Sequence, residues 1–171
     1  PSFPWGVAWS CAGLGVVVVA PLVGAIADRG GLRRRFWLLV AMTGMVATAA
    51  LYGVEQGEWL AAVVLFVTAT IGFMGANIFY DALLVSVAKE SEWDFVSALG
   101  YALGYLGGGL LFGLNVAMTL SPESFGLASA TEAVRLSFVS VAIWWGLFSL
   151  PLILWVKETP AKQPMRGWAV A

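Results

Sequence analysis

The sequence has no histidine, a single cysteine (Cys11), and only 11% charged residues among its 171. Soluble domains carry about 25% charged residues, so an ordinary soluble domain is excluded. Zinc sites built from histidine and cysteine clusters, and catalytic triads that use histidine, are excluded as well. One cysteine cannot form a disulfide framework. Because 60% of the residues are hydrophobic, the predicted class is an all-α polytopic membrane protein.

Five apolar segments are long enough to cross a bilayer as helices. A transmembrane helix needs about 20 mostly apolar residues to span about 30 Å of hydrocarbon. We therefore expect a helical membrane bundle over residues 1–156 and a cytoplasmic linker or tail over residues 157–171, in which prolines and spaced charges interrupt any helix. The third helix could continue as far as Ala88. The expected helices run from about Trp5 to Ala27, Phe36 to Tyr52, Trp59 to Ala82, Phe95 to Leu120 and Val134 to Val156.

The basic residues are distributed unevenly between the two sides of this bundle. Of the nine lysines and arginines, all but Arg135 follow the first, third or fifth segment. Because cytoplasmic loops are enriched in basic residues, that side is predicted to be cytoplasmic, with the chain start outside and the chain end inside. We expect a multi-pass protein of the bacterial inner membrane. The segment before the first helix has no basic residue, which argues against a signal peptide, and the initial proline suggests a fragment or a processed chain.

One connection carries the strongest pattern: Gly24-Ala25-Ile26-Ala27-Asp28-Arg29-Gly30-Gly31-Leu32-Arg33-Arg34-Arg35. Its paired glycines accept the left-handed backbone angles that a short reversal between two membrane helices needs. Asp28 lies among four arginines, just before the amino end of the second helix, where a carboxylate can accept backbone N–H groups. The alternative is an ordinary basic loop with a chance aspartate.

This stretch resembles motif A of the major facilitator superfamily, written roughly Gly-x-(Leu/Ile)-Ala-Asp-Arg-x-Gly-x-(Arg/Lys)-(Arg/Lys). Leu32 departs from the basic residue often found at its position. The resemblance implies that the motif joins helices two and three of a six-helix half and gates its cytoplasmic side, so that the five segments correspond to helices two to six. The gating residues that it implies are Gly24, Asp28, Arg29, Gly31, Arg33 and Arg34.

Two further segments indicate which branch of the superfamily the chain resembles. The segment Asn77-Ile78-Phe79-Tyr80-Asp81-Ala82-Leu83-Leu84 and the glycine-rich segment from Ser97 to Gly109 resemble Atg22-like proteins, which are related to vacuolar amino-acid effluxers. Val85 stands where that branch usually has proline, so the helix can continue there without a break. With motif A, the resemblance covers Gly24 to Gly109.

Polar residues of the third segment form the first candidate site. Asn77 and Asp81 lie one turn apart on one helix face, with Tyr80 beside them. Asp81 is roughly 33 Å along the helix from Trp59, near the cytoplasmic interface. Because charge in hydrocarbon is costly, an ionisable group at membrane depth is a functional candidate, and proton coupling through Asp81 is one hypothesis. The alternative is a carboxylate that reaches the interface or contacts the missing half of the protein.

Glycines of the fourth segment form the second candidate. Gly100, Gly104 and Gly108 are four residues apart and share one helix face, where another backbone can approach closely. We expect a helix-packing seam there. The alternative is a seam that slides or bends during transport.

The resemblance implies a secondary transporter that moves a small solute by alternating access between two halves. As written, the chain would be an incomplete half bundle, without a first helix or a second half. It would contact the lipid bilayer and the missing remainder of the transporter, or else a partner membrane protein. The alternative function is a non-transporting structural subunit of a larger membrane complex. No enzyme activity, cofactor, metal or nucleic-acid partner is expected, and the sequence does not identify the substrate.

Overall fold

The computed structural model describes residues 33–156 together with Gly6 and Gly13, and within this part every regular element is a helix. The predicted all-α membrane class is confirmed. The first expected helix, the glycine pair of its connection and the expected tail lie almost wholly outside the described residues. The described elements are α2 (Arg33–Ala50), α3 (Trp59–Val87), α4 (Trp93–Leu120), α5 (Ala130–Trp155) and the short 3₁₀ turns Leu51–Gly53, Glu90–Glu92 and Pro122–Phe125.

Four of these helices are long and apolar enough to cross a membrane. The fifth expected segment begins earlier than predicted, at Ala130 in place of Val134. Ser129 explains the earlier start, because its Oγ accepts the backbone N–H of Glu132 at 3.2 Å, while Glu132 Oε2 accepts the N–H of Ala128 at 2.8 Å. The first bond satisfies a donor that a helix leaves open in its first turn, and the second holds the residue that precedes the cap.

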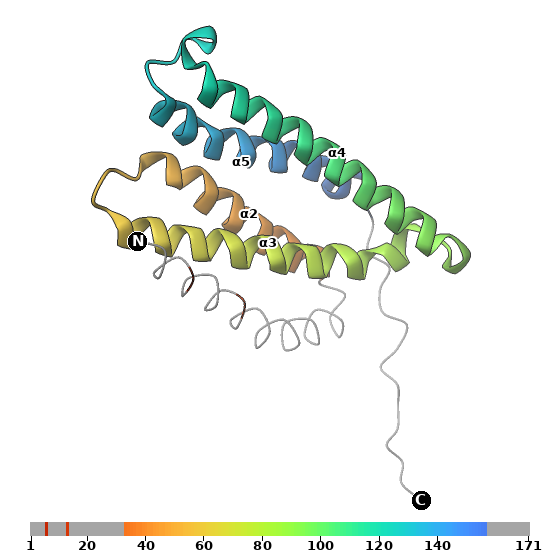
Figure 1. Cartoon of the computed structure of the whole chain (residues 1–171). Coiled ribbons are helices and arrows are strands. Elements are labelled where there is room, and N and C mark those ends of the chain that lie inside the picture. The colour runs from red at the N-terminus through yellow and green to blue at the C-terminus, as the bar shows by residue number, and fades with distance from the viewer. Residues whose placement is uncertain (1–5, 7–12, 14–32, 157–171) are drawn as a thin grey trace, which may run out of the picture.

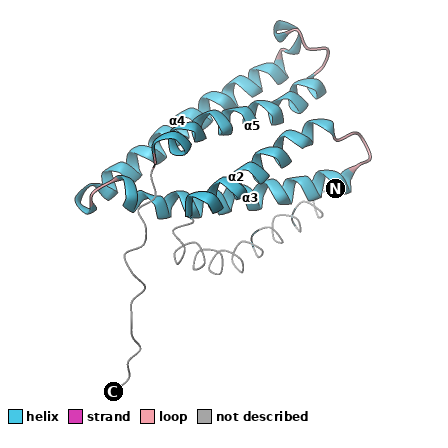
Figure 2. Cartoon of the chain, turned by 180° about the vertical axis from the view of Figure 1, so that it is seen from behind, coloured by secondary structure: helices cyan, strands magenta, loops and turns pink. Residues whose placement is uncertain are grey.

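The helices lie side by side in the order α3, α2, α5, α4 (Figure 1). The hairpin neighbours α2 and α3 pack most extensively, α4 packs on α5, and α2 joins the two hairpins by packing on α5. The described parts of α3 and α4 make few contacts, and they approach each other near their short connection (Figure 2). The bundle therefore has two ends, which we call the Arg33 end, where α2 begins and α5 finishes, and the Tyr52 end, where α2 finishes and α5 begins.

The closest approach in the bundle is between the backbones of α2 and α3. A Cβ atom built on Gly72 would lie 2.5 Å from Gly44 Cα and 2.8 Å from the Val40 carbonyl oxygen, so only glycine fits there. The indole of Trp145 from α5 covers the other side of Gly44, because a Cβ on Gly44 would lie 2.6 Å from its ring. Phe73 of α3 meets the Trp145 ring edge-on, with centroids 5.8 Å apart. Two glycines thus let three helices meet at one point.

Buried apolar side chains extend this contact toward the Arg33 end. Phe36 stacks on Phe79 with ring centroids 6.0 Å apart, which ties the first turn of α2 to α3. The buried cluster consists of Trp37, Ala41, Met45, Ala76, Phe79, Leu83 and Leu152. The core therefore lies where α2, α3 and α5 meet.

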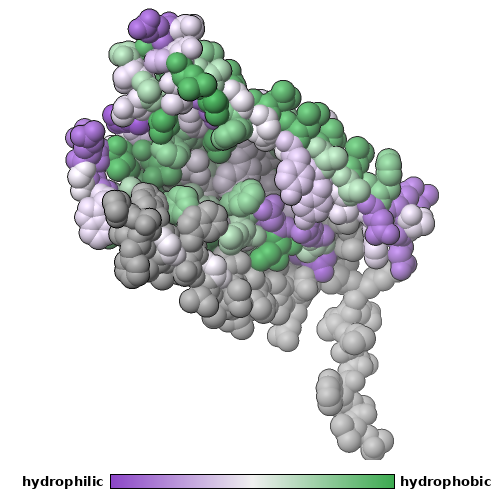
Figure 3. All heavy atoms as spheres, viewed as in Figure 1, coloured by the Kyte–Doolittle hydropathy of each residue, from purple (hydrophilic) through white to green (hydrophobic). Residues whose placement is uncertain are grey.

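The helix α4 contributes little to this core, since Leu111 is its one buried residue. Its surface is mostly apolar, with exposed side chains that include Leu103, Leu106, Leu110 and Phe112. Figure 3 shows hydrophobic residues gathered over this helix. Such a surface suits contact with lipid chains or with another membrane helix.

Candidate functional site

Two arginines at the start of α2 hold the neighbouring helices at the Arg33 end. Arg33 Nη1 donates to the carbonyl oxygen of Ala82 in α3 at 3.2 Å. Arg34 Nη2 donates to the carbonyl oxygen of Ile153 in the last turn of α5. Carbonyls in the last turn of a helix have no partner within the helix, and a cation there is favoured by the helix dipole. Arg34 therefore caps α5 while it joins α5 to α2.

These two arginines are the described part of the predicted gating motif. Gly24, Asp28, Arg29 and Gly31 lie outside the described residues. The motif predicted the arginines themselves, but their acceptors are main-chain oxygens remote in sequence, which no side-chain pattern indicates.

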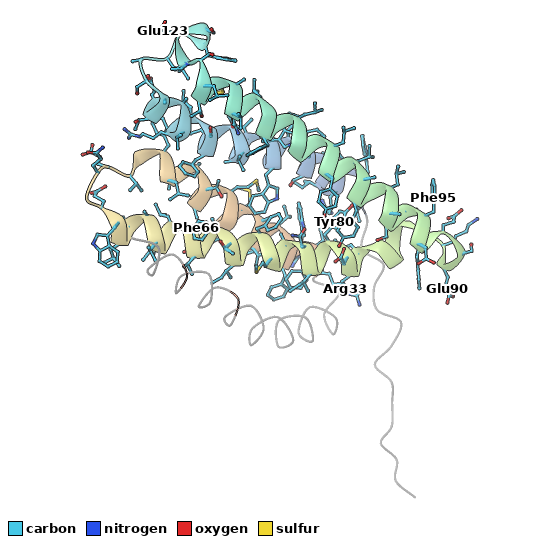
Figure 4. The ribbon with its side chains drawn as sticks, viewed as in Figure 1. Arg33, Phe66, Tyr80, Glu90, Phe95 and Glu123 are labelled. Atoms are coloured by element: carbon cyan, nitrogen blue, oxygen red, sulfur yellow. The ribbon has the colours of Figure 1, made fainter. Side chains whose placement is uncertain are left out.

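The predicted polar residues Asn77, Tyr80 and Asp81 are all exposed on α3, in its half nearer the Arg33 end. Figure 4 shows the Tyr80 side chain in the space between α3 and α4. Its hydroxyl lies over Gly100, where an added Cβ would be 3.2 Å from Tyr80 Oη. The structure thus brings together one residue from each of the two predicted sites.

Asp81 precedes Ala82, whose carbonyl oxygen accepts the hydrogen bond from Arg33. Within residues 33–156, the side chains of Asn77 and Asp81 make no hydrogen bond or ion pair. Asp81 lies near the expected cytoplasmic interface, where water, a solute or a polar group of another helix can reach these exposed side chains. The face of α3 that carries them is therefore the best candidate for contact with a solute, water or a further helix.

The glycine seam predicted on α4 stays a prediction. Gly104 and Gly108 have no described atom within 4 Å of an added Cβ. The tight glycine contact that the structure does contain, Gly44 against Gly72, was missed at the sequence level. Small residues at helical spacing could have indicated this contact. Gly72 and Ala76 are four residues apart on α3, and Ala41 and Gly44 are three residues apart on α2.

The Tyr52 end has its own arginine contact. Arg135 Nε of α5 donates to the carbonyl oxygen of Tyr52 at 2.7 Å, and the guanidinium carbon lies 5.1 Å from the centroid of the Tyr52 ring. One turn and a half further along α5, Ser140 Oγ donates to Asn115 Oδ1 of α4 at 3.0 Å. Sequence reasoning singled out Arg135 only as the exception to the charge distribution.

The four long apolar helices are those of a multi-pass helical membrane protein. The family model described as "Vacuole effluxer Atg22 like" matches residues 8–93 and 85–170, and the chain belongs to this family. The resemblance noted in the sequence is confirmed.

Two curated relatives give the family match more detail. The "Uncharacterized MFS-type transporter YxiO" of Bacillus subtilis (strain 168) is 36% identical over 144 residues, which are 84% of this chain and 34% of that protein. "Autophagy-related protein 22" of Yarrowia lipolytica (strain CLIB 122 / E 150) is 31% identical over 65 residues, 38% of this chain and 10% of that protein. The chain thus spans about a third of the length of the first relative. No solved structure matches the chain significantly.

Proposed function

We propose that this chain is part of a secondary transporter of the major facilitator type, which moves a small solute across a membrane by alternating access. The observation that carries the proposal is the match of 84% of the chain to a relative named as a transporter of that type. A transporter, and not an enzyme or a structural subunit, is the function that these relatives favour. We further infer that the Arg33 end faces the cytoplasm of a bacterial cell, because the basic residues concentrate there.

The proposal is tested on the full-length protein in proteoliposomes. Small solutes of several chemical classes, such as amino acids, sugars, organic acids and nucleosides, are screened by tracer flux and by currents on a solid-supported membrane. We expect saturable flux of at least one class, absent from protein-free liposomes and from liposomes that hold an unrelated membrane protein. If monodisperse protein moves no solute of any class, the transporter assignment is wrong.

Within this function, we infer that Asp81 carries the coupling proton. The support is its place on an exposed face of α3 with no polar partner in residues 33–156, because an ionisable residue in a membrane helix is rare and commonly functional. We expect Asp81→Asn to abolish stimulation of flux by a pH gradient, because an amide cannot release a proton. Flux without a gradient should persist.

Two matched variants separate coupling from folding. Asn77→Ala removes the neighbouring polar side chain on the same face, and Glu90→Gln removes an exposed carboxylate from the α3–α4 connection. Both should keep the response to the pH gradient, even where the rate falls. Full pH-dependent flux by Asp81→Asn would rule out the coupling role.

A further inference from the structure

Arg135 at the Tyr52 end contacts Tyr52 and has no role in the proposed transport. Arg135 lies five residues into α5, which has 26 residues and is therefore about 39 Å long. Measured along the helix axis, Arg135 is about 11 Å from the middle of α5, whereas the hydrocarbon layer extends about 15 Å from its own middle. With the middle of α5 at the middle of the bilayer, the Arg135 backbone lies about 4 Å inside the hydrocarbon edge. Because helical side chains point toward the N-terminus of their helix, the long arginine side chain brings its guanidinium up to the headgroup boundary.

Contacts with Tyr52 hold the Arg135 guanidinium on one side only. The Nε–H is used by the Tyr52 carbonyl at 2.7 Å, and the Tyr52 ring lies against the guanidinium face. A guanidinium has five N–H donors in a planar fork, so four remain on the two terminal nitrogens. In the part of the chain that the structure describes, these four donors have no acceptor.

Two glutamates at the Tyr52 end each accept a hydrogen bond from a nearby backbone N–H group. Glu132 Oε2 accepts the N–H of Ala128 at 2.8 Å, and Glu58 Oε2 accepts the N–H of Glu55 at 3.0 Å. Neither forms an ion pair with Arg135. The sequence also has no aspartate or glutamate before Asp28. Within residues 33–156 no carboxylate forms an ion pair with Arg135, so the open side of its guanidinium is available to an anion from outside the described chain.

We propose that Arg135, oriented by Tyr52, binds the phosphate group of a phospholipid headgroup at the Tyr52 end of the bundle. The two terminal nitrogens present parallel donors, the arrangement that binds phosphate oxygens in pairs. Phosphates are the acceptors that a bilayer supplies at this depth. Tyr52, in the 3₁₀ turn after α2, and the exposed Trp59, at the start of α3, are aromatic residues of the type found at the same headgroup level. This inference does not depend on the transport function.

The test uses the full-length protein in a phosphate-free detergent, titrated with phosphatidylglycerol or, in a separate series, with inorganic phosphate. Native mass spectrometry counts the bound lipids, and scanning fluorimetry follows the unfolding midpoint. At lipid concentrations that just fill the natural protein, we expect Arg135→Gln to hold one lipid fewer, because loss of a charged hydrogen-bonded contact weakens that binding step roughly tenfold or more. Arg35→Gln, which removes an exposed arginine at the opposite end, should leave this step unchanged.

Arg135→Lys keeps the charge without the planar fork, and it keeps the test usable if Arg135→Gln does not fold. We expect it to bind the lipid less tightly than the natural protein does. Stabilisation by inorganic phosphate equal to that by lipid would overturn the proposal, because the bilayer would then contribute nothing. Equal lipid counts in all variants would also overturn it.

Discussion

Replacing Gly72 with alanine should prevent α2 and α3 from packing and remove most of the folded protein. The new Cβ would lie 2.5 Å from Gly44 Cα, 2.7 Å from the Gly44 nitrogen and 2.8 Å from the Val40 carbonyl oxygen. All three are backbone atoms, so no side chain can rotate away and the helices themselves must separate. Overpacking typically costs about 1–3 kcal/mol where side chains can adjust, and we expect about 3 kcal/mol or more here.

The measurement is the yield of monodisperse full-length protein and its unfolding midpoint in detergent. Gly113→Ala is the matched control, because it adds the same methyl group inside α4 where no described atom lies within 4 Å. That variant should be neutral, or more stable by up to about 1 kcal/mol, since alanine favours the helix more than glycine does. A Gly72→Ala protein with the natural yield and midpoint would show that the two backbones do not approach as closely as described.

The contact of Gly44 with Gly72 was not predicted from the sequence, although the helices were. Length and apolar composition were sufficient to predict the helices α2 to α5, because a membrane helix must satisfy its own backbone. They could not predict which faces meet. A helix in lipid is apolar on every side, so no amphipathic pattern marks the face that packs on another helix. The regular spacing of Gly100, Gly104 and Gly108 predicted a seam on α4, whereas the close contact is between Gly44 and Gly72.

The residues of the candidate site could likewise be predicted, but their partners could not. Motif resemblance pointed to Arg33 and Arg34, and the rarity of charge in membrane segments made Asp81 a candidate, which stays a prediction. The partners of the arginines could not be predicted, because the carbonyl oxygens of Ala82 and Ile153 look like those of any residue. Only the packing of the helices decides which carbonyl lies within reach.

The contacts of α2 with α5 suggest that the two helices move together. Arg34 joins them at the Arg33 end, and at the Tyr52 end Arg135 joins α5 to the 3₁₀ turn that follows α2, through the carbonyl of Tyr52. Between these ends, the Trp145 indole fills the space over Gly44. Three contacts along one interface oppose both sliding and tilting. A change in position of the arginine-rich start of α2 would therefore reach the far end of α5.

Truncating Trp145 tests the middle contact and should have the second large effect. Trp145→Ala removes the ring that lies over Gly44 and meets Phe73 edge-on, and it leaves a cavity where α2, α3 and α5 converge. Removal of a packed tryptophan costs about 3–5 kcal/mol in protein cores, and we expect a loss of about 3 kcal/mol. Thermal unfolding of the full-length protein in detergent measures it.

The neighbouring residue supplies a control of the same size. Trp144 packs on Phe148, with ring centroids 4.7 Å apart, and Phe148 is itself 62% exposed, so lipid can replace much of this contact. We therefore expect Trp144→Ala to lower the unfolding midpoint clearly less than Trp145→Ala does. Combining Gly44→Ala with Trp145→Ala adds a methyl group where the ring was, and should cost less than the sum of the two single changes, because the 2.6 Å approach is then gone. Strict additivity of the two changes, or equal losses for the two tryptophans, would mean that Trp145 does not fill the space over Gly44.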